Sequence, residues 1–252
     1  MKMKKISVII CLVSILFSCT SRKNVAYFSD IENNKTEILK SYEIRLQPDD
    51  LLKIIINSQT EELLSDFNKT QNTGVAAVGS SPLQTYLIDK DGYITYPVIG
   101  NIKLGGLTRN EAIDVLTKAV RTFIKDATVN LRIANFKVTV QGEVRKPGTF
   151  TIESERITLL QALSMAEDMT IYGKRSHVII IREQDGQRTF NVVDMSSSEF
   201  MNSDFYYLAQ NDVVYVEPNK TRINSSVLGL DTSTILSAIS VTITVIALLL
   251  KF

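Results

Sequence analysis

An uncharged stretch near the C-terminus constrains this chain more than any other feature. It covers 19 residues, from Thr232 to Leu250, and is bounded by Asp231 and Lys251. As an α-helix it would be about 28 Å long, which is close to the thickness of the hydrocarbon core of a bilayer. The sequence therefore predicts one C-terminal transmembrane helix, within a membrane segment of residues 221–252.

Small hydroxylated side chains follow one line along this predicted helix. They are Ser233, Ser237, Ser240 and Thr244. Because they are separated by four, three and four positions, they fall on a single helical face. Such a stripe favours packing against other helices, or it faces water in the lumen of a ring of helices. The alternative is a plain tail anchor in which each hydroxyl bonds a carbonyl of its own helix.

The N-terminus carries a second membrane signal. Three lysines precede the apolar run Ile6–Phe17, which at about 12 residues is too short to span a bilayer. This layout is typical of a bacterial secretory signal. The run ends in "LFSC", which resembles a lipobox, where cleavage leaves the cysteine to take acyl chains. We therefore predict a signal peptide at 1–18, lipid attachment at Cys19 and a lipidated tether at 19–41. The alternative is an ordinary signal with an incidental cysteine.

The composition argues against several classes of function. Lys and Arg number 28 against 27 Asp and Glu, so no strong field attracts nucleic acid. Cleavage before Cys19 would remove Cys11, and His177 is the one histidine. A zinc site or a histidine-based triad would have almost no side chains to use. We therefore expect no catalytic residues, no metal and no cofactor, and the chain is not expected to be an enzyme.

Two capping boxes predict helices between the membrane signals. The first pairs Thr108 with Glu111 and opens a helix over 108–126, and the second pairs Thr158 with Gln161. The apolar face of the first helix would contain Ala112, Leu116, Val120 and Phe123. Each helix follows one β-rich segment and precedes another, so the body of the chain is predicted to be α+β.

Several short turns punctuate the β-rich segments. Asp91-Gly92, Lys146-Pro147-Gly148 and Asp185-Gly186 each predict a hairpin. A further turn occurs twice, because "LQPDDLLKI" at 46–54 aligns with "LAQNDVVYV" at 208–216 and pairs Asp50 with Asp212. Either aspartate can hold its turn by accepting backbone N–H groups, and a catalytic carboxylate pair is the alternative. The predicted structural turn residues are Asp50, Asp212, Gly142, Pro147 and Gly148.

The order of four segments resembles the polysaccharide export family of outer-membrane lipoproteins. They are "YEIRLQPDDLLKI", "DGYITYPVIGNIKLGGLTRNEA", "ATVNLRI" and "VTVQGEVRKPGTF". The resemblance covers residues 42–220 and implies an export domain at 42–134, followed by a soluble-ligand-binding β-grasp domain at 135–220. This chain has Asp49 and Asn211 where the family usually has glycine, and Glu167-Asp168 where a glycine pair is common.

The resemblance implies a role in transport. Members of the family form rings beneath the outer membrane, and one C-terminal helix per chain builds a helical barrel. Capsular or extracellular polysaccharide leaves through the lumen, handed over by an inner-membrane copolymerase that is often a tyrosine kinase. The expected partners are therefore other copies of the chain, outer-membrane lipid, the polysaccharide and that copolymerase. The chain would be lipid-anchored in the outer membrane with its soluble domains in the periplasm. The alternatives are a twice-anchored scaffold or glycan-binding module without a channel, and a carbohydrate-active enzyme.

Overall fold

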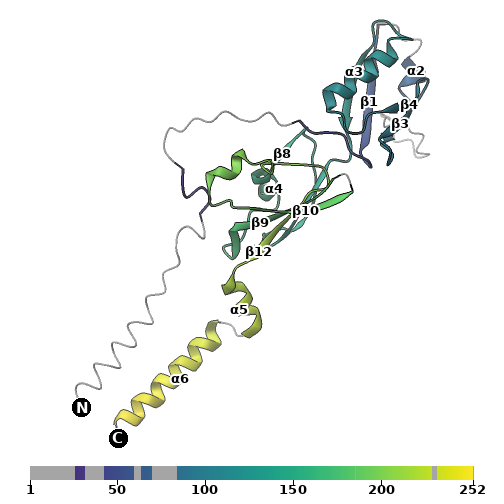
Figure 1. The fold of residues 1–252 in the computed structure, drawn as a ribbon. Coiled ribbons are helices and arrows are strands. Elements are labelled where there is room, and N and C mark those ends of the chain that lie inside the picture. Colours follow the sequence, from purple (N-terminus) through teal and green to yellow (C-terminus); the bar gives the residue numbers. More distant parts are fainter. Residues whose placement is uncertain are drawn as a thin grey trace, which may run out of the picture.

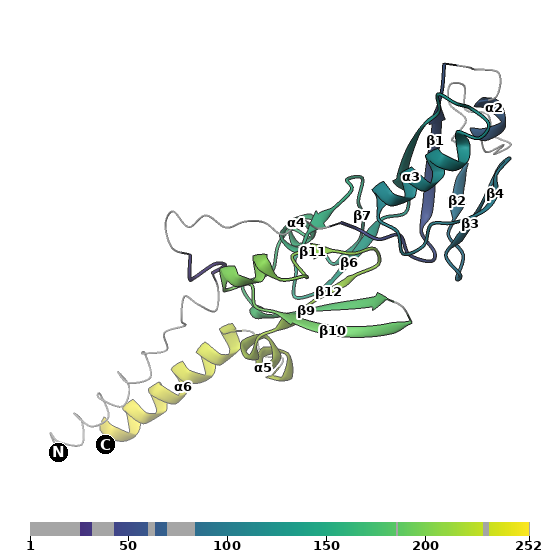
Figure 2. The ribbon, with the colours of Figure 1, turned by 45° about the horizontal axis from the view of Figure 1, so that its top comes forward.

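The computed structural model describes residues 26–31, 43–59, 64–69, 84–184, 186–228 and 232–251. These residues form two α+β lobes and a C-terminal helical segment that extends from the second lobe (Figure 1). The first lobe lies between residues 43 and 134, and the second between residues 136 and 218. A view from another side shows the same elongated arrangement, with the first lobe far from the C-terminal helix (Figure 2). The predicted α+β class is confirmed.

The first lobe is a small antiparallel sheet covered by one helix. Strand β1 lies between β2 and β5, and a separate hairpin is formed by β3 and β4. The elements are β1 (Leu51–Asn57), α2 (Leu64–Phe67), β2 (Thr85–Leu87), β3 (Tyr93–Tyr96), β4 (Gly100–Lys103), α3 (Arg109–Val120) and β5 (Thr128–Ile133).

Hydrophobic alternation explains the packing of this lobe. Leu52, Ile54 and Ile56 are buried on one face of β1, as the two-residue period of a strand requires. The apolar face of α3 joins the same core. Thr108 and Glu111 form the predicted capping box, with both reciprocal hydrogen bonds present.

Helix α3 is shorter than predicted. It ends at Val120 and continues as a turn, so Phe123 leaves the apolar face of the helix and is 50% exposed. Thr122 contributes to this ending, because its hydroxyl bonds the carbonyl of Ala119 and competes with the helical ladder.

The second lobe is built on a five-stranded mixed sheet in the order β10-β9-β12-β6-β7. Only the pairing of β12 with β6 is parallel. A second capping box, between Thr158 and Gln161, starts the helix that packs against β6. The elements are β6 (Lys137–Gly142), β7 (Gly148–Thr151), β8 (Ile157–Thr158), α4 (Leu159–Met165), β9 (Gly173–Gln184), β10 (Gln187–Val193), η3 (Ser198–Asn202), β11 (Tyr207–Leu208) and β12 (Val213–Pro218).

Two of the three predicted hairpins form. Strands β6 and β7 pair around Pro147, and β9 and β10 pair around Gly186. The turn at Asp91-Gly92 also forms, with Gly92 at a φ of 85°. The strands beside it nevertheless pair elsewhere, β2 with β1 and β3 with β4, so the hairpin prediction was wrong. The reason is that the Gly92 carbonyl accepts the N–H groups of Leu104 and Gly105, which holds the turn against the end of β4.

The C-terminal segment is helical in two pieces, α5 (Lys220–Leu228) and α6 (Thr232–Lys251). Within the part of the chain that the structure describes, no helix is long and apolar enough to cross a membrane. The predicted transmembrane assignment of 232–250 is therefore not supported.

Candidate functional site

The first aspartate turn is held by a buried carboxylate. Asp50 is fully buried, and its Oδ2 accepts the N–H of Gln47 at 2.8 Å. Its Oδ1 has no hydrogen-bond partner among the residues that the structure describes. Burial raises the pKa of Asp50 to about 6, and the neighbouring charge of Asp49 adds to this rise. Asp49 itself adopts a φ of 69°, the left-handed conformation in which the family usually has glycine.

The second aspartate turn repeats this geometry with a charged partner. Asp212 is fully buried, and its Oδ2 accepts the N–H of Ala209 at 2.8 Å. Arg182 reaches both oxygens of the same carboxylate, at 3.0 and 2.7 Å. Burial raises the pKa of Asp212, and the guanidinium of Arg182 opposes that rise. Asn211 takes the left-handed position at a φ of 64°. Arg182 was not predicted, because nothing in the sequence marks which strand residue faces the turn.

Both turns meet at the linker between the lobes. The side chain of Asn135 accepts the N–H of Leu51 at 2.9 Å and donates to the carbonyl of Asp49 at 2.9 Å. The carbonyl of Asn135 accepts the side-chain amide of Gln210 at 2.8 Å. Gln210 also accepts the N–H of Lys137, the first residue of β6. The repeated motif therefore lies on either side of the junction, which favours a structural role for the two aspartates over a shared catalytic one.

Gly142 permits the close approach of two strands. Its φ is 91°, and a Cβ built on it would lie 2.1 Å from the carbonyl oxygen of Val216 on β12. No larger residue fits this position without a shift of the backbone. Pro147 and Gly148 lie in the β6–β7 connection, with Gly148 opposite Val140.

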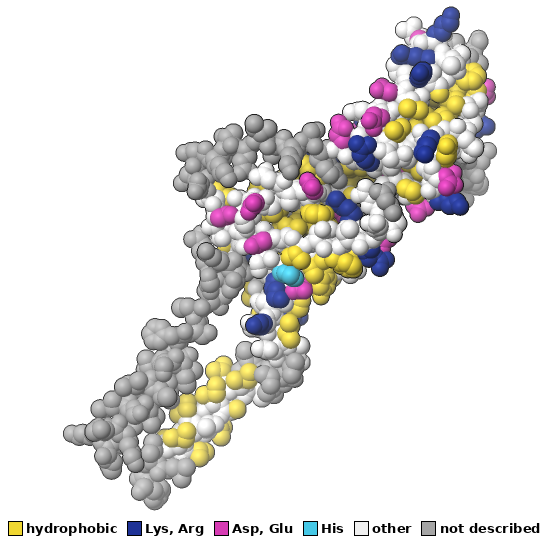
Figure 3. Space-filling view, viewed as in Figure 1, with side chains coloured by type: hydrophobic (Ala, Val, Ile, Leu, Met, Phe, Trp, Pro, Cys, Tyr) yellow, Lys and Arg dark blue, Asp and Glu magenta, His cyan; other side chains and the backbone are white. Residues whose placement is uncertain are grey.

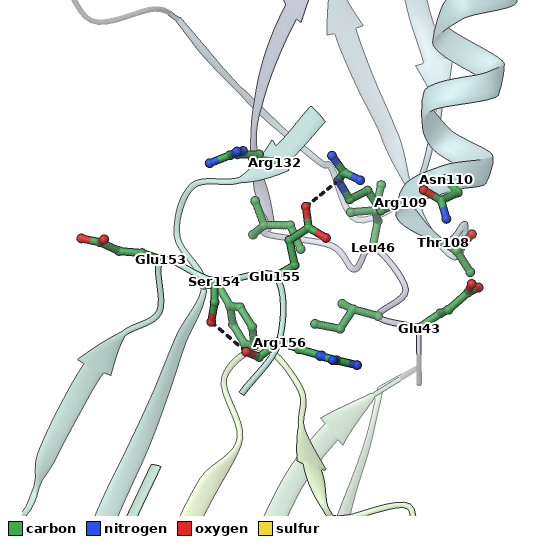
Figure 4. Close-up of a pocket in the computed structure, with 13 residues that line it drawn as sticks. Glu43, Leu46, Thr108, Arg109, Asn110, Arg132, Glu153, Ser154, Glu155 and Arg156 are labelled. Carbon is green, nitrogen blue, oxygen red and sulfur yellow. Dashed lines mark hydrogen bonds and ion pairs between the residues drawn. The ribbon is translucent and has the colours of Figure 1, made fainter. Parts of the chain in front are cut away.

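A cleft of about 590 Å³ lies between the lobes (Figure 4). Its apolar side includes Leu46 and Phe136, and its charged side chains carry both signs. The charged and polar lining residues are Glu43, Thr108, Arg109, Asn110, Arg132, Glu153, Ser154, Glu155 and Arg156. Arg109 is held by Glu155 at 3.4 Å and by the carbonyl of Leu131 at 2.8 Å. Three Glu and three Arg side chains line the cleft, so its charged groups balance, and polar and apolar surface face the same space.

The outer face of the second sheet is apolar and open. Phe190 and Val192 on β10 are 66% and 55% exposed. Their cross-strand partners are Ile181 and Ile179 on β9, and Ile179 pairs with Tyr215 on β12. Figure 3 shows hydrophobic side chains gathered beside the single histidine of the chain, which lies on β9. Contiguous exposed apolar surface of this kind is typical of an interaction site. The sequence did not reveal it, because alternation alone does not say whether the second face of a sheet is covered.

Two hydroxyls of the α6 stripe donate hydrogen bonds within their own helix. Ser240 donates to the carbonyl of Ser237 at 2.9 Å, and Thr244 donates to that of Ser240 at 2.8 Å. This is the bonding expected of a plain anchor, although each hydroxyl oxygen still has acceptor capacity. The side chain of Ser233 lies outside the described residues, as does Cys19 with the whole predicted signal peptide.

Among the described residues, no group of three or more His, Cys, Asp and Glu side chains is placed to hold a metal ion. His177 lies on β9 with Glu217 at 3.7 Å. The two aspartate turns and the cleft define the architecture of the chain: two lobes joined through a repeated turn, with a polar cleft between them.

Comparison with known proteins divides the chain at the same place as the two lobes. Residues 39–134 match the family described as polysaccharide biosynthesis/export protein, and residues 136–216 match the SLBB domain. The chain belongs to the polysaccharide export family.

Two relatives are named EPS I polysaccharide export outer membrane protein EpsA. The protein from Ralstonia solanacearum is 26% identical over 192 residues, which cover 73% of this chain and 50% of the relative. The protein from Ralstonia nicotianae is 29% identical over 154 residues, which cover 58% of this chain and 40% of the relative. The chain therefore spans half of these relatives or less.

Proposed function

We propose that this chain is an outer-membrane lipoprotein that assembles into an oligomeric channel and exports capsular or extracellular polysaccharide from the periplasm. The observation that carries the proposal is the order of an export domain and an SLBB domain in one chain. The names of the two relatives support the polysaccharide and the outer membrane as expectations for this chain.

The proposed anchor is lipid on Cys19, with the soluble lobes in the periplasm. The position of Cys19 directly after the apolar N-terminal run supports this assignment. We assign residues 1–18 to the signal peptide, 42–134 to the export domain, 135–220 to the β-grasp domain and 221–252 to a C-terminal helical segment.

Self-association is proposed because one chain cannot enclose a polymer. The open face of β9, β10 and β12 supplies apolar surface that a neighbouring copy could cover. We further propose that the α6 helices of neighbouring copies pack against one another, with the stripe Ser233, Ser237, Ser240 and Thr244 turned toward the lumen or the next helix. Since the described hydroxyls of Ser240 and Thr244 already donate within the helix, they can face a neighbour without an unsatisfied donor.

The polymer would be delivered by an inner-membrane copolymerase, often a tyrosine kinase in this family. The end of the first lobe is the natural place for that contact, because it lies at the opposite end of the molecule from α6 (Figure 2).

Two measurements test the channel. The mass of the detergent-solubilised protein should correspond to a closed oligomer, and a strain without the protein should retain its polysaccharide in the periplasm. Single cysteines along α6 should react with a water-soluble thiol reagent at 237, 240 and 244, but not at 239, 243 and 246. A monomeric mass with uniform protection of α6 would instead favour the twice-anchored scaffold or glycan-binding module without a channel.

A further inference from the structure

Residues 26–31, which belong to the predicted lipidated tether at 19–41, lie against the second lobe. The N–H of Phe28 donates to the carbonyl of Met195 at 3.3 Å, and the N–H of Ser29 donates to the carbonyl of Ser196 at 2.7 Å. Main-chain bonds of this kind are how an extended peptide is held beside a folded domain.

Tyr27 covers a buried charge on the second lobe. Its ring lies 5.1 Å from the guanidinium of Arg175, a residue that is only 5% exposed. The Nη1 atom of Arg175 donates to the carbonyls of Thr170 and Gly173, at 3.3 and 3.2 Å. The hydroxyl of Tyr27 donates to the carboxylate of Asp168. Burial, together with this hydrogen bond, raises the pKa of the tyrosine hydroxyl. A cation under an aromatic face in a dry environment is stabilised more than one at an exposed site.

Phe28 and Asp30 also contact the second lobe. The ring of Phe28 stacks on that of Phe200 with centroids 5.7 Å apart. The carboxylate of Asp30 accepts the hydroxyl of Ser197 at 2.6 Å and the N–H of Ser198 at 2.7 Å, where η3 begins. Asp30 thereby satisfies a backbone donor that the short helix leaves open at its start.

We propose that the second lobe carries a docking site for an extended peptide and that its ligand is the chain's own segment Tyr27–Asp30. The site consists of the acceptor Asp168, the cation Arg175, the ring of Phe200 and the Ser196–Ser198 backbone. This assignment does not depend on the proposed channel, because the contacts lie within one chain. The docking limits how far the second lobe can lie from the proposed lipid on Cys19. The eight residue steps from Cys19 to Tyr27 extend to at most about 28 Å.

The docked segment also supports an unusual loop. Glu167 and Asp168 both adopt positive φ angles, 58° and 68°, where the family commonly has glycine. Such conformations persist when surrounding contacts over-determine them. Asp168 has two such contacts, because its carboxylate accepts the N–H of Met169 as well as the hydroxyl of Tyr27.

A single tryptophan can report the docking, because the chain contains none. Phe28→Trp places the indole at the stacked position, and the matched control Ile31→Trp places it at a position that is 56% exposed. The full-length protein in detergent should show a severalfold smaller acrylamide quenching constant at position 28 than at 31, with emission shifted to the blue. Equal quenching at both positions would overturn the docking site.

A second substitution tests the contacts themselves. In the Phe28→Trp protein, Asp30→Ala should raise the quenching constant toward that of the exposed control, whereas Asp114→Ala, an exposed aspartate on α3, should not. Unchanged protection after Asp30→Ala would refute the role given to this carboxylate. If Phe28→Trp does not fold, Tyr27→Trp is the second reporter, because its ring retains the position over Arg175.

Discussion

Replacing Asp50 with asparagine should remove a pH-dependent part of the stability of the first lobe. The carboxylate is fully buried, one of its oxygens has no partner among the described residues, and burial raises its pKa to about 6 from the ordinary 3.8. An asparagine can keep the hydrogen bond from the N–H of Gln47 through its own oxygen, so the turn geometry is retained while the charge is lost.

The stability of the first lobe should fall as the pH rises, because burial raises the pKa of Asp50. The folded chain holds the Asp50 proton more tightly than the unfolded chain, so protonation stabilises the fold. This contribution is fully present below about pH 3.8 and is lost as the pH rises through about 6. The rise of the Asp50 pKa from 3.8 to about 6 corresponds to a difference of about 3 kcal/mol in the free energy of unfolding between the two ends of this pH range.

Urea unfolding can measure this term if the two lobes are separated spectroscopically. Phe123→Trp places a unique tryptophan beside Phe67 in the first lobe, 6.0 Å from ring to ring in the native pair. The free energy of unfolding is then compared, with and without Asp50→Asn, between about pH 4 and about pH 7. The protein with Asp50 should lose about 2.4 kcal/mol more than the asparagine variant over this interval, because pH 4 already lies just above the ordinary pKa of the carboxyl group.

The comparison cancels any constant cost of the new amide, because only the change with pH is used. A difference between the two proteins that stays flat across the range would refute the reasoning. It would mean that the buried carboxylate titrates at its ordinary pKa.

Four other substitutions test three separate features. Arg182→Met should destabilise the second lobe by about 3 kcal/mol at neutral pH, because it leaves the buried Asp212 without its cation; thermal unfolding measures this, and a loss under about 1 kcal/mol would contradict it. Gly142→Ala should cost about 3 kcal/mol or more through its clash with β12, whereas Gly186→Ala, also at positive φ but in open space, should cost about 1 kcal/mol. Cys19→Ala should abolish acylation, and an unmodified mass for the mature wild-type N-terminal peptide would disprove the lipid anchor.

The sequence predicted the elements that depend on local chemistry. Both capping boxes form, since a Thr followed by Glu or Gln three residues later satisfies the first backbone donors of a helix wherever it is. The repeated turn was also visible, because Asp49 and Asn211 tolerate the left-handed backbone that it requires.

Features that depend on distant contacts were not predictable. The contacts of residues 26–31 with the second lobe are one example, because the partners of Tyr27 and Asp30 lie more than 140 positions away in the sequence. The hairpin at Asp91-Gly92 failed for the same reason, since a two-residue turn does not decide whether its strands pair with each other or with other strands.

The junction at Asn135 also affects how the molecule moves. Its side chain is bonded to one aspartate turn and its carbonyl to the other, so the linker has few free torsions between the lobes. We therefore expect the two lobes to rotate together as one rigid body. In such a rotation the displacement of an atom grows with its distance from the axis. A small tilt of the second lobe would thus become its largest movement at α2 and the β3–β4 hairpin, the far end of the first lobe (Figure 2).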